Sequence, residues 1–221
     1  MLILLILTAL SKADLSAALR KKYVRGFAAG TALWLMYMAT LAGAGVFKNL
    51  EPPPRIVLFL IFPAFVFIAY FFWSKKFEAL LRGIPPAWPV YLQSFRIAVE
   101  LLILGVFLKG LATFEPTLEG YNFDILAGIS APIIAWLGFQ RRVLPAWVLK
   151  YWNYAGLLLL VNVVGIFMTL MLKPTLWGYA STPIQPEFGT MPYLLIPAIF
   201  MPLAVFLHFF TGAVAAKFVV F

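Results

Sequence analysis

Long apolar segments recur along the chain, separated by short charged or proline- and glycine-rich stretches. Six segments have this length and apolar character, and they are 26–47, 56–73, 89–108, 123–139, 151–172 and 191–216. Each approaches the roughly 20 residues that a helix needs to cross a bilayer. Segment 89–108 differs from the rest because it carries charges, and 123–139 because it is short and contains Pro132. The pattern predicts six membrane-spanning helices.

The first twenty residues are a separate case. They begin with ten largely apolar residues and continue into a polar half that contains Lys12 and Asp14. No basic residue precedes the apolar part, so it is a poor signal peptide. We predict a seventh, N-terminal span here, with a helix lying in the membrane interface as the alternative.

Composition places the whole chain in an apolar solvent. Hydrophobic residues make up 64% of the 221 residues and charged residues 11%, against about 45–50% and about 25% in soluble domains. A water-soluble globule is therefore excluded, and the expected fold is an all-α, polytopic transmembrane helix bundle that forms one domain over residues 1–221. The absence of cysteine excludes disulfides and thiolate metal sites.

The basic residues are distributed unevenly between the two sets of loops. One set holds Lys12, Arg20, Lys21, Lys22, Arg25, Lys75, Lys76, Arg82, Arg141, Arg142, Lys150 and Lys217, and the other only Lys48, Arg55, Lys109 and Lys173. Cytoplasmic loops collect lysine and arginine, so the first set and the C-terminus are predicted to face the cytoplasm. Topology then accounts for the net charge of +9, and no nucleic-acid partner is expected.

A few polar side chains fall inside the predicted spans. Arg96 and Glu100 are four residues apart, which places them on one helix face, and Gln93 extends the same stripe. A rise of about 1.5 Å per residue brings His208 near the depth of Arg96 and Asn162 near that of Glu100. We predict that Arg96, Glu100, Asn162 and His208 form one layer at the bilayer midplane. Gln93 belongs to the same stripe, and Arg96 and Glu100 form a buried ion pair.

Asn153 is left outside this layer, because it lies nine residues before Asn162 and so half a turn out of phase on a helix. Two interpretations of the layer stay open. It either fixes helix packing through hydrogen bonds between helices or binds a ligand, an ion or a proton. In the second case His208 is a natural switch, because its ordinary pKa lies near 6.5.

A second polar cluster is expected at the outer face. Asn122 or Asp124 can cap the helix that follows, and Glu115 and Glu119 precede it in the loop. Small residues continue one face of that helix, and they are Gly128, Ala131 and Ala135. These carboxylates could bind a hard cation, but their spacing matches no metal motif, and we predict neither a metal nor another cofactor.

Several of these segments together resemble a known group of proteins. They are Gln93-Ser-Phe-Arg96 with Glu100, Gly120-Tyr-Asn122-Phe-Asp124 continuing to Gly128 and Ala131-Pro132, and the last helix with His208. In these the chain resembles a family of uncharacterised bacterial polytopic inner-membrane proteins that has no established activity. The resemblance implies a bacterial inner-membrane location and implies nothing about chemistry.

Three functions are compatible with the sequence. The midplane layer could bind or translocate a small solute or protons. Alternatively, the protein could be a structural or assembly subunit without catalytic activity, or a membrane enzyme that acts on lipid at the outer face through Asp124, Glu115 and Glu119. The expected partners are the lipid bilayer and either other membrane subunits or further copies of the chain.

Overall fold

The computed structural model describes residues 7, 10–11 and 14–218, and this part of the chain contains helices and no β-strand. The α-helices are α2 (Ala17–Gly43), α3 (Phe62–Trp73), α4 (Glu78–Gly83), α5 (Ala87–Leu92), α6 (Arg96–Leu108), α7 (Ile125–Ala135), α8 (Ala146–Leu172) and α9 (Met201–Phe218). The short 3-10 helices are η1 (Val46–Lys48), η3 (Lys75–Phe77), η4 (Gln93–Phe95), η6 (Pro174–Trp177) and η7 (Pro186–Gly189), and the π-helical segments are η2 (Val57–Ile61), η5 (Trp136–Gln140) and η8 (Ile196–Phe200). The predicted all-α class is confirmed.

Fewer helices qualify as membrane spans than the six predicted. Among the described residues, four are long and apolar enough to cross a bilayer, and they are Ala17–Gly43, Ala87–Leu108, Ala146–Leu172 and Ile196–Ala213. A bent pair, Val57–Trp73 with Lys75–Gly83 at 73°, gives a fifth if it is counted as one span. The correct number by length and composition is therefore four or five.

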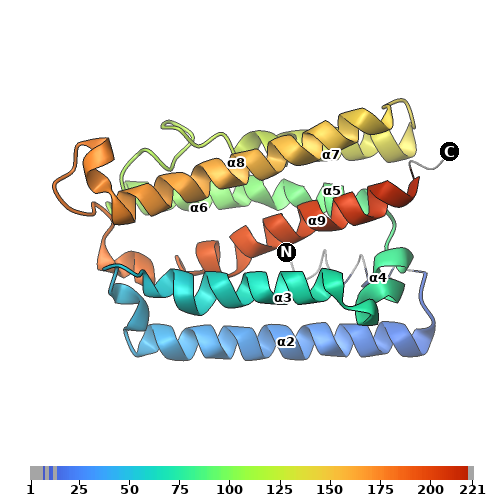
Figure 1. Cartoon of the computed structure of the whole chain (residues 1–221), viewed down its shortest axis with the longest axis horizontal. Helices are drawn as coiled ribbons and strands as arrows, with labels where there is room; N and C mark the ends of the chain where they lie inside the picture. Colours follow the sequence, from blue (N-terminus) through green and yellow to red (C-terminus); the bar gives the residue numbers. More distant parts are fainter. Residues whose placement is uncertain (1–6, 8–9, 12–13, 219–221) are drawn as a thin grey trace.

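The remaining predicted span, at 123–139, is a short apolar helix, Ile125–Gln140. Asp124, at the start of this helix, contacts Arg96 in the middle of Ala87–Leu108. The helix therefore begins partway along the bundle, as Figure 1 shows for α7. The chain between α6 and α7 returns without regular helix from the end of α6 to this depth. That return takes up length that a full span would have used.

The predicted seventh span lies largely outside the described residues, and the part that is described does not continue as one helix. Ser16 caps α2 by accepting a hydrogen bond from the Leu19 amide at 3.4 Å. Just before it, the Asp14 amide donates to the Gly83 carbonyl at 2.8 Å. Residues 14–16 therefore form a break, and α2 starts as a separate helix there.

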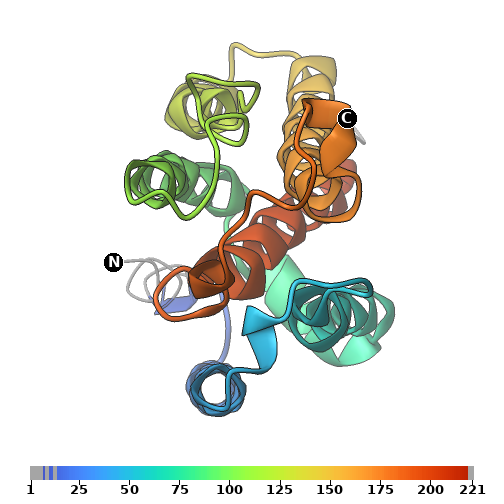
Figure 2. The same cartoon turned by 90° about the vertical axis from the view of Figure 1, so that its left-hand side faces the viewer.

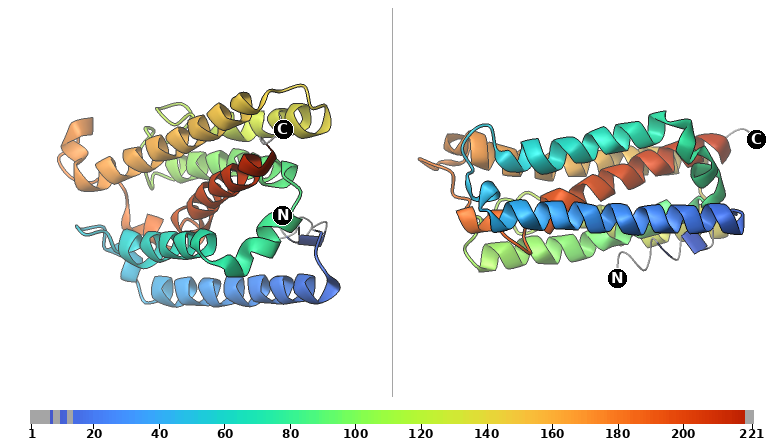
Figure 3. Two further views of the ribbon diagram at one scale, coloured as in Figure 1. Left: turned by 45° about the vertical axis from the view of Figure 1, so that its right-hand side comes forward. Right: turned by 90° about the horizontal axis from the view of Figure 1, so that it is seen from below.

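The α9 helix occupies the centre of the bundle. It packs against α8, α5, α3 and α4, and Figures 1 and 2 show it running obliquely between the α2–α3 side and the α5–α8 side. The further views in Figure 3 place α2 along the outer side of the bundle. Accordingly, Met38 is the only residue of α2 that is buried.

Two aromatic donors of α2 bind carbonyls in π-helical segments of the neighbouring helices. Trp34 Nε1 donates to the Ala198 carbonyl of η8 at 3.0 Å, and the Tyr37 hydroxyl donates to the Phe59 carbonyl of η2 at 3.1 Å. A π-helical turn widens the helix and disturbs its ordinary hydrogen-bond register. The two bonds attach an otherwise lipid-exposed helix to the bundle at those points.

The basic loops gather at one end of the bundle. The start of α2, the segment from η3 through α4 to the start of α5, and the α7–α8 connection all lie at the right in Figure 1. The α2–α3 and α8–α9 connections lie at the opposite end, and the α6–α7 connection turns inward from that end. Most of the basic residues predicted to share one side are in these three segments. The loop arrangement thus agrees with the predicted grouping.

Candidate functional site

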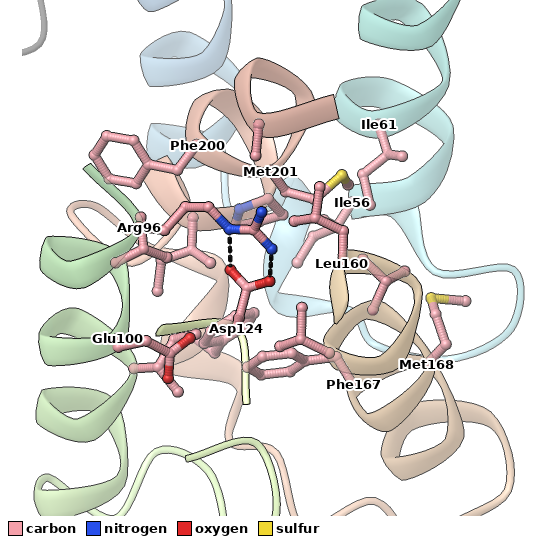
Figure 4. A pocket seen from close by; sticks show the side chains of 18 of the residues that line it. Ile56, Ile61, Arg96, Glu100, Asp124, Leu160, Phe167, Met168, Phe200 and Met201 are labelled. Carbon is pink, nitrogen blue, oxygen red and sulfur yellow. Dashed lines mark hydrogen bonds and ion pairs between the residues drawn. The ribbon is translucent and has the colours of Figure 1, made fainter. Parts of the chain in front are cut away.

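Arg96 is the centre of a buried polar cluster that joins four helices. It is only 1% exposed, and its Nε donates to Asp124 Oδ2 at 2.7 Å while Nη2 pairs with Asp124 Oδ1. Nη2 also donates to the Gly156 carbonyl of α8 at 3.2 Å, and Nη1 lies 2.9 Å from Nε2 of His208 in α9. Figure 4 shows the two-pronged contact with Asp124.

The predicted ion pair between Arg96 and Glu100 was wrong, because the partner of Arg96 is Asp124. Residues four apart on a helix can pair, as Glu78 and Arg82 do, but Asp124 binds Nε and Nη2 of Arg96, and Glu100 binds Asn122 instead. The start of α7 presents the Asp124 carboxylate end-on, which permits the paired geometry that arginine favours. The midplane layer and the predicted outer cluster therefore meet in one site.

Arg96 also determines the tautomer of His208. A guanidinium only donates hydrogen bonds, so the Nε2 atom of His208 must accept from it. Nδ1 then carries the proton and donates to Asn153 Oδ1 at 2.8 Å. His208, which is 0% exposed, is held as the neutral Nδ1–H form.

Asn153 is the residue that the sequence interpretation missed. The phase argument correctly placed Asn153 and Asn162 on opposite faces of α8, but it assigned the inward face to the wrong one. Asn153 is buried, whereas Asn162 is exposed and donates from Nδ2 to the Tyr121 carbonyl at 2.7 Å. A signal existed, since a buried histidine needs a hydrogen-bond partner on a neighbouring helix.

The irregular chain before α7 explains what Asn162 and Asn122 do. Backbone that is not helical at membrane depth must have its polar groups satisfied from elsewhere in the protein. Asn122 donates to the Pro116 carbonyl at 2.9 Å and accepts from the Asp124 amide at 2.9 Å. Asn162 donates to the Tyr121 carbonyl. Asp124 makes no side-chain capping bond to α7, because its carboxylate is used by Arg96.

Glu100 lies one helical turn beyond Arg96 and has a different partner. Its Oε1 accepts from Asn122 Nδ2 at 2.7 Å. Its Oε2 is buried and has no hydrogen-bond partner among the described residues. Glu100 is 4% exposed, and it forms no salt bridge within the described part of the chain.

Gln93 is buried one turn before Arg96 and contacts α9. Its Nε2 donates to the Ala204 carbonyl at 3.2 Å, while Oε1 has no partner among the described residues. Gln93 does not line the cavity described below. Its hydrogen bond joins η4 to α9.

The predicted outer carboxylate group does not assemble. Glu119 is exposed, Asp124 is engaged by Arg96, and Glu115 is buried and accepts from the Tyr179 hydroxyl at 2.9 Å. Burial and the bond to Glu115 raise the pKa of Tyr179, which keeps this hydroxyl a donor. No group of three or more histidine, cysteine or acidic side chains suited to a metal occurs in the described part of the chain.

A cavity of about 70 Å³ adjoins the cluster. Arg96, Glu100 and Asp124 are the charged residues in its wall. The rest of the wall is apolar. Most of it comes from η2, α6, α8 and the η8–α9 helix, with single residues from η4 and η7, and Figure 4 shows many of these side chains. The arrangement is a small apolar chamber with one polar end.

The small-residue face of α7 brings the cluster together. Asp124, Gly128, Ala131 and Ala135 are all buried, as the stripe predicted. A Cβ atom on Gly128 would lie 3.0 Å from the Ile97 amide nitrogen and 3.3 Å from Arg96 Cβ. The close approach of α7 to α6 is what allows a short aspartate to reach the guanidinium.

Comparison with known proteins identifies no relative, since no family model, curated protein or solved structure matches the chain. The described part of the chain defines the class by itself, since it is all-helical and contains four or five helices suited to crossing a membrane. Its distinguishing feature is the buried cluster around Arg96.

Proposed function

We propose that the protein is a multi-pass protein of the bacterial inner membrane, with its basic loops and C-terminus in the cytoplasm, and that the cluster binds a small solute. The one observation that carries the binding proposal is the buried, unpaired Oε2 of Glu100 in a residue that lines the cavity. A buried carboxylate oxygen without a hydrogen bond is costly. A solute that donates a hydrogen bond to it removes that cost.

The geometry favours solute binding over a proton relay through the cluster. A relay needs groups that accept and donate protons in turn, whereas Arg96 only donates and stays charged. It occupies the Nε2 atom of His208 at 2.9 Å, which is the nitrogen that a relay through the ring would need. Translocation, if it follows binding, moves the solute bound at Glu100.

Ligand binding to the folded state should appear as stabilisation. Butylamine and butanol each bring one donor group, and a ligand at 100 times its Kd adds about 2.7 kcal/mol. We expect at least one of the two to raise the melting temperature of the wild-type protein in detergent. Neither should raise the melting temperature of Glu100→Gln. Butyrate, which carries only acceptors at neutral pH, should not stabilise the protein.

Glu119→Gln is the matched control for this measurement, since it removes an acid that is exposed in the same region of the chain. It should respond to the two donor probes as the wild type does. An equal response of Glu100→Gln, or no response of the wild type to either donor, contradicts the proposal.

A structural or assembly subunit is the second candidate, and one observation favours it. The side-chain nitrogens of Arg96 all have partners, namely Asp124, His208 and the Gly156 carbonyl. A fully bonded cluster of this kind can serve only to fix the packing of α6, α7, α8 and α9. This candidate predicts that an apolar pair can replace Arg96 and Asp124.

A further inference from the structure

The wall of the cavity indicates the kind of molecule that fits it. Apart from the three charged residues at one end, the lining side chains are aliphatic, aromatic or methionine. A solute with many polar groups would lose its hydrogen bonds to water there without replacement. The body of a fitting molecule is therefore apolar.

The cavity lies beside the lateral surface of the bundle rather than at either end. Val57 and Ile61 on one side, and Val164 and Met168 on the other, line it and are partly exposed. Figure 2 shows α3 and α8 apart from one another with α9 between them. In a bilayer, lipid chains cover this surface.

The neighbouring surface is apolar as well. Leu58 and Phe62 near one side of the cavity are 45% and 63% exposed, and Leu158 and Val161 on α8 are 69% and 67% exposed. A molecule dissolved in the bilayer can reach the partly exposed wall residues across this surface without crossing a polar region.

The polar end of the cavity specifies the head of the molecule. The Asp124 oxygens both bind Arg96, and the guanidinium nitrogens all have partners. Among the described residues that line the cavity, Glu100 has the one buried side-chain oxygen or nitrogen without a partner, and it is an acceptor. A head that donates a hydrogen bond complements it, and an anionic head does not.

The volume limits how much of the molecule enters. A cavity of about 70 Å³ exceeds the roughly 10–15 Å³ that holds one water molecule on the same measure, which leaves room for a hydroxyl or an amine. It is too small for a long chain. The chain must extend outward between η2–α3 and α8.

On the basis of the proposed function, we infer that the solute is a single-chain amphiphile with a hydroxyl or amine head, which enters from the bilayer between η2–α3 and α8 and donates a hydrogen bond to Glu100. Its apolar chain remains against the lipid-facing wall. The site is thus reached from the membrane and not from water.

Two carbodiimides test the direction of access, because both add to carboxyl groups and the adducts can be located by peptide mass spectrometry. N,N′-dicyclohexylcarbodiimide dissolves in the bilayer, whereas a carbodiimide with a charged dimethylaminopropyl group stays in water. In protein reconstituted in liposomes we expect the first reagent to modify Glu100 and the second to modify exposed Glu119 and leave Glu100 intact. Modification of Glu100 by the aqueous reagent at the same rate overturns the entry route but leaves a solute site at Glu100 standing. Failure of both reagents at Glu100 overturns the site as well.

Competition identifies the head group without any change in the protein. Decanol or decylamine should slow the modification of Glu100 several-fold. Comparing the two shows whether the site prefers a hydroxyl head or an amine head. Decane and decanoate should not slow it, because the first has no head and the second has an anionic head. Equal protection by decane, or protection by decanoate alone, overturns the assignment of a donor head.

A pair of tryptophan substitutions tests the position of the entrance. Val164→Trp places a large ring at the cavity wall and should reduce labelling of Glu100 by the bilayer-soluble reagent at least several-fold. Val161→Trp is the control, since Val161 lies on the same helix, is exposed and does not line the cavity. Thermal unfolding shows whether each variant is folded. Equal labelling of folded Val164→Trp and Val161→Trp contradicts entry between η2–α3 and α8.

Discussion

Replacing Arg96 with alanine is expected to cost about 3–5 kcal/mol of unfolding free energy, the effect of removing one partner from a buried ion pair. The cost arises because the Asp124 carboxylate, 3% exposed, would keep its charge without a counter-ion in an apolar environment. Denaturant-induced unfolding in mixed micelles, followed by circular dichroism, measures the difference.

The double variant Arg96→Met with Asp124→Leu should recover most of this loss, because apolar residues of similar volume can replace a buried ion pair without penalty. A remainder of about 1–3 kcal/mol is expected, since His208 Nε2 would lose its donor. If the double variant is as unstable as Arg96→Ala, the pair is not a replaceable packing element and the structural candidate is contradicted.

The chain offers a matched surface pair as the control. Arg82 and Glu78 also form an ion pair, but their side chains are 67% and 47% exposed. Exposed pairs contribute about 0–1 kcal/mol. Arg82→Met with Glu78→Leu should therefore change stability little, and a large effect there would show that the assay responds to any change in charge.

The sequence predicted which residues take part in the buried cluster better than it predicted their pairing. Depth along each helix correctly placed Arg96, Glu100 and His208 inside the bundle, because membrane thickness and helix rise limit where a residue can lie. It could not show that Asp124 lies at the same depth. That requires the chain after α6 to return into the bundle without helix, a path that hydropathy does not encode.

The sequence also could not show which side of α8 faces the inside of the bundle. Helical phase shows that Asn153 and Asn162 point in opposite directions, but it does not reveal which direction is inward. The α8 helix is apolar around most of its circumference, so the pattern gives no face to prefer. Tertiary partners decide it, namely His208 for Asn153 and the Tyr121 carbonyl for Asn162.

Gly156 is a position where one methyl group should disturb the whole cluster. It lies on α8 directly against the His208 ring, and a Cβ atom there would be 2.6 Å from His208 Nε2 and 3.4 Å from Arg96 Nη1. The ring cannot move aside freely, because each of its nitrogens is hydrogen-bonded. We expect Gly156→Ala to lower stability by about 1–3 kcal/mol, the usual cost of overpacking a core.

Gly165→Ala is the control, because Gly165 is on the same helix and has nothing within 4 Å of the added Cβ. Alanine favours a helix interior over glycine by up to about 1 kcal/mol, so this variant should be as stable as the wild type or more stable. Unfolding in mixed micelles compares the two, and equal effects would contradict the packing of His208 against α8. The two variants are expected to change stability in opposite directions because the space beside each glycine differs. At Gly156 the missing side chain makes room for the histidine that binds Arg96, and at Gly165 it makes room for nothing.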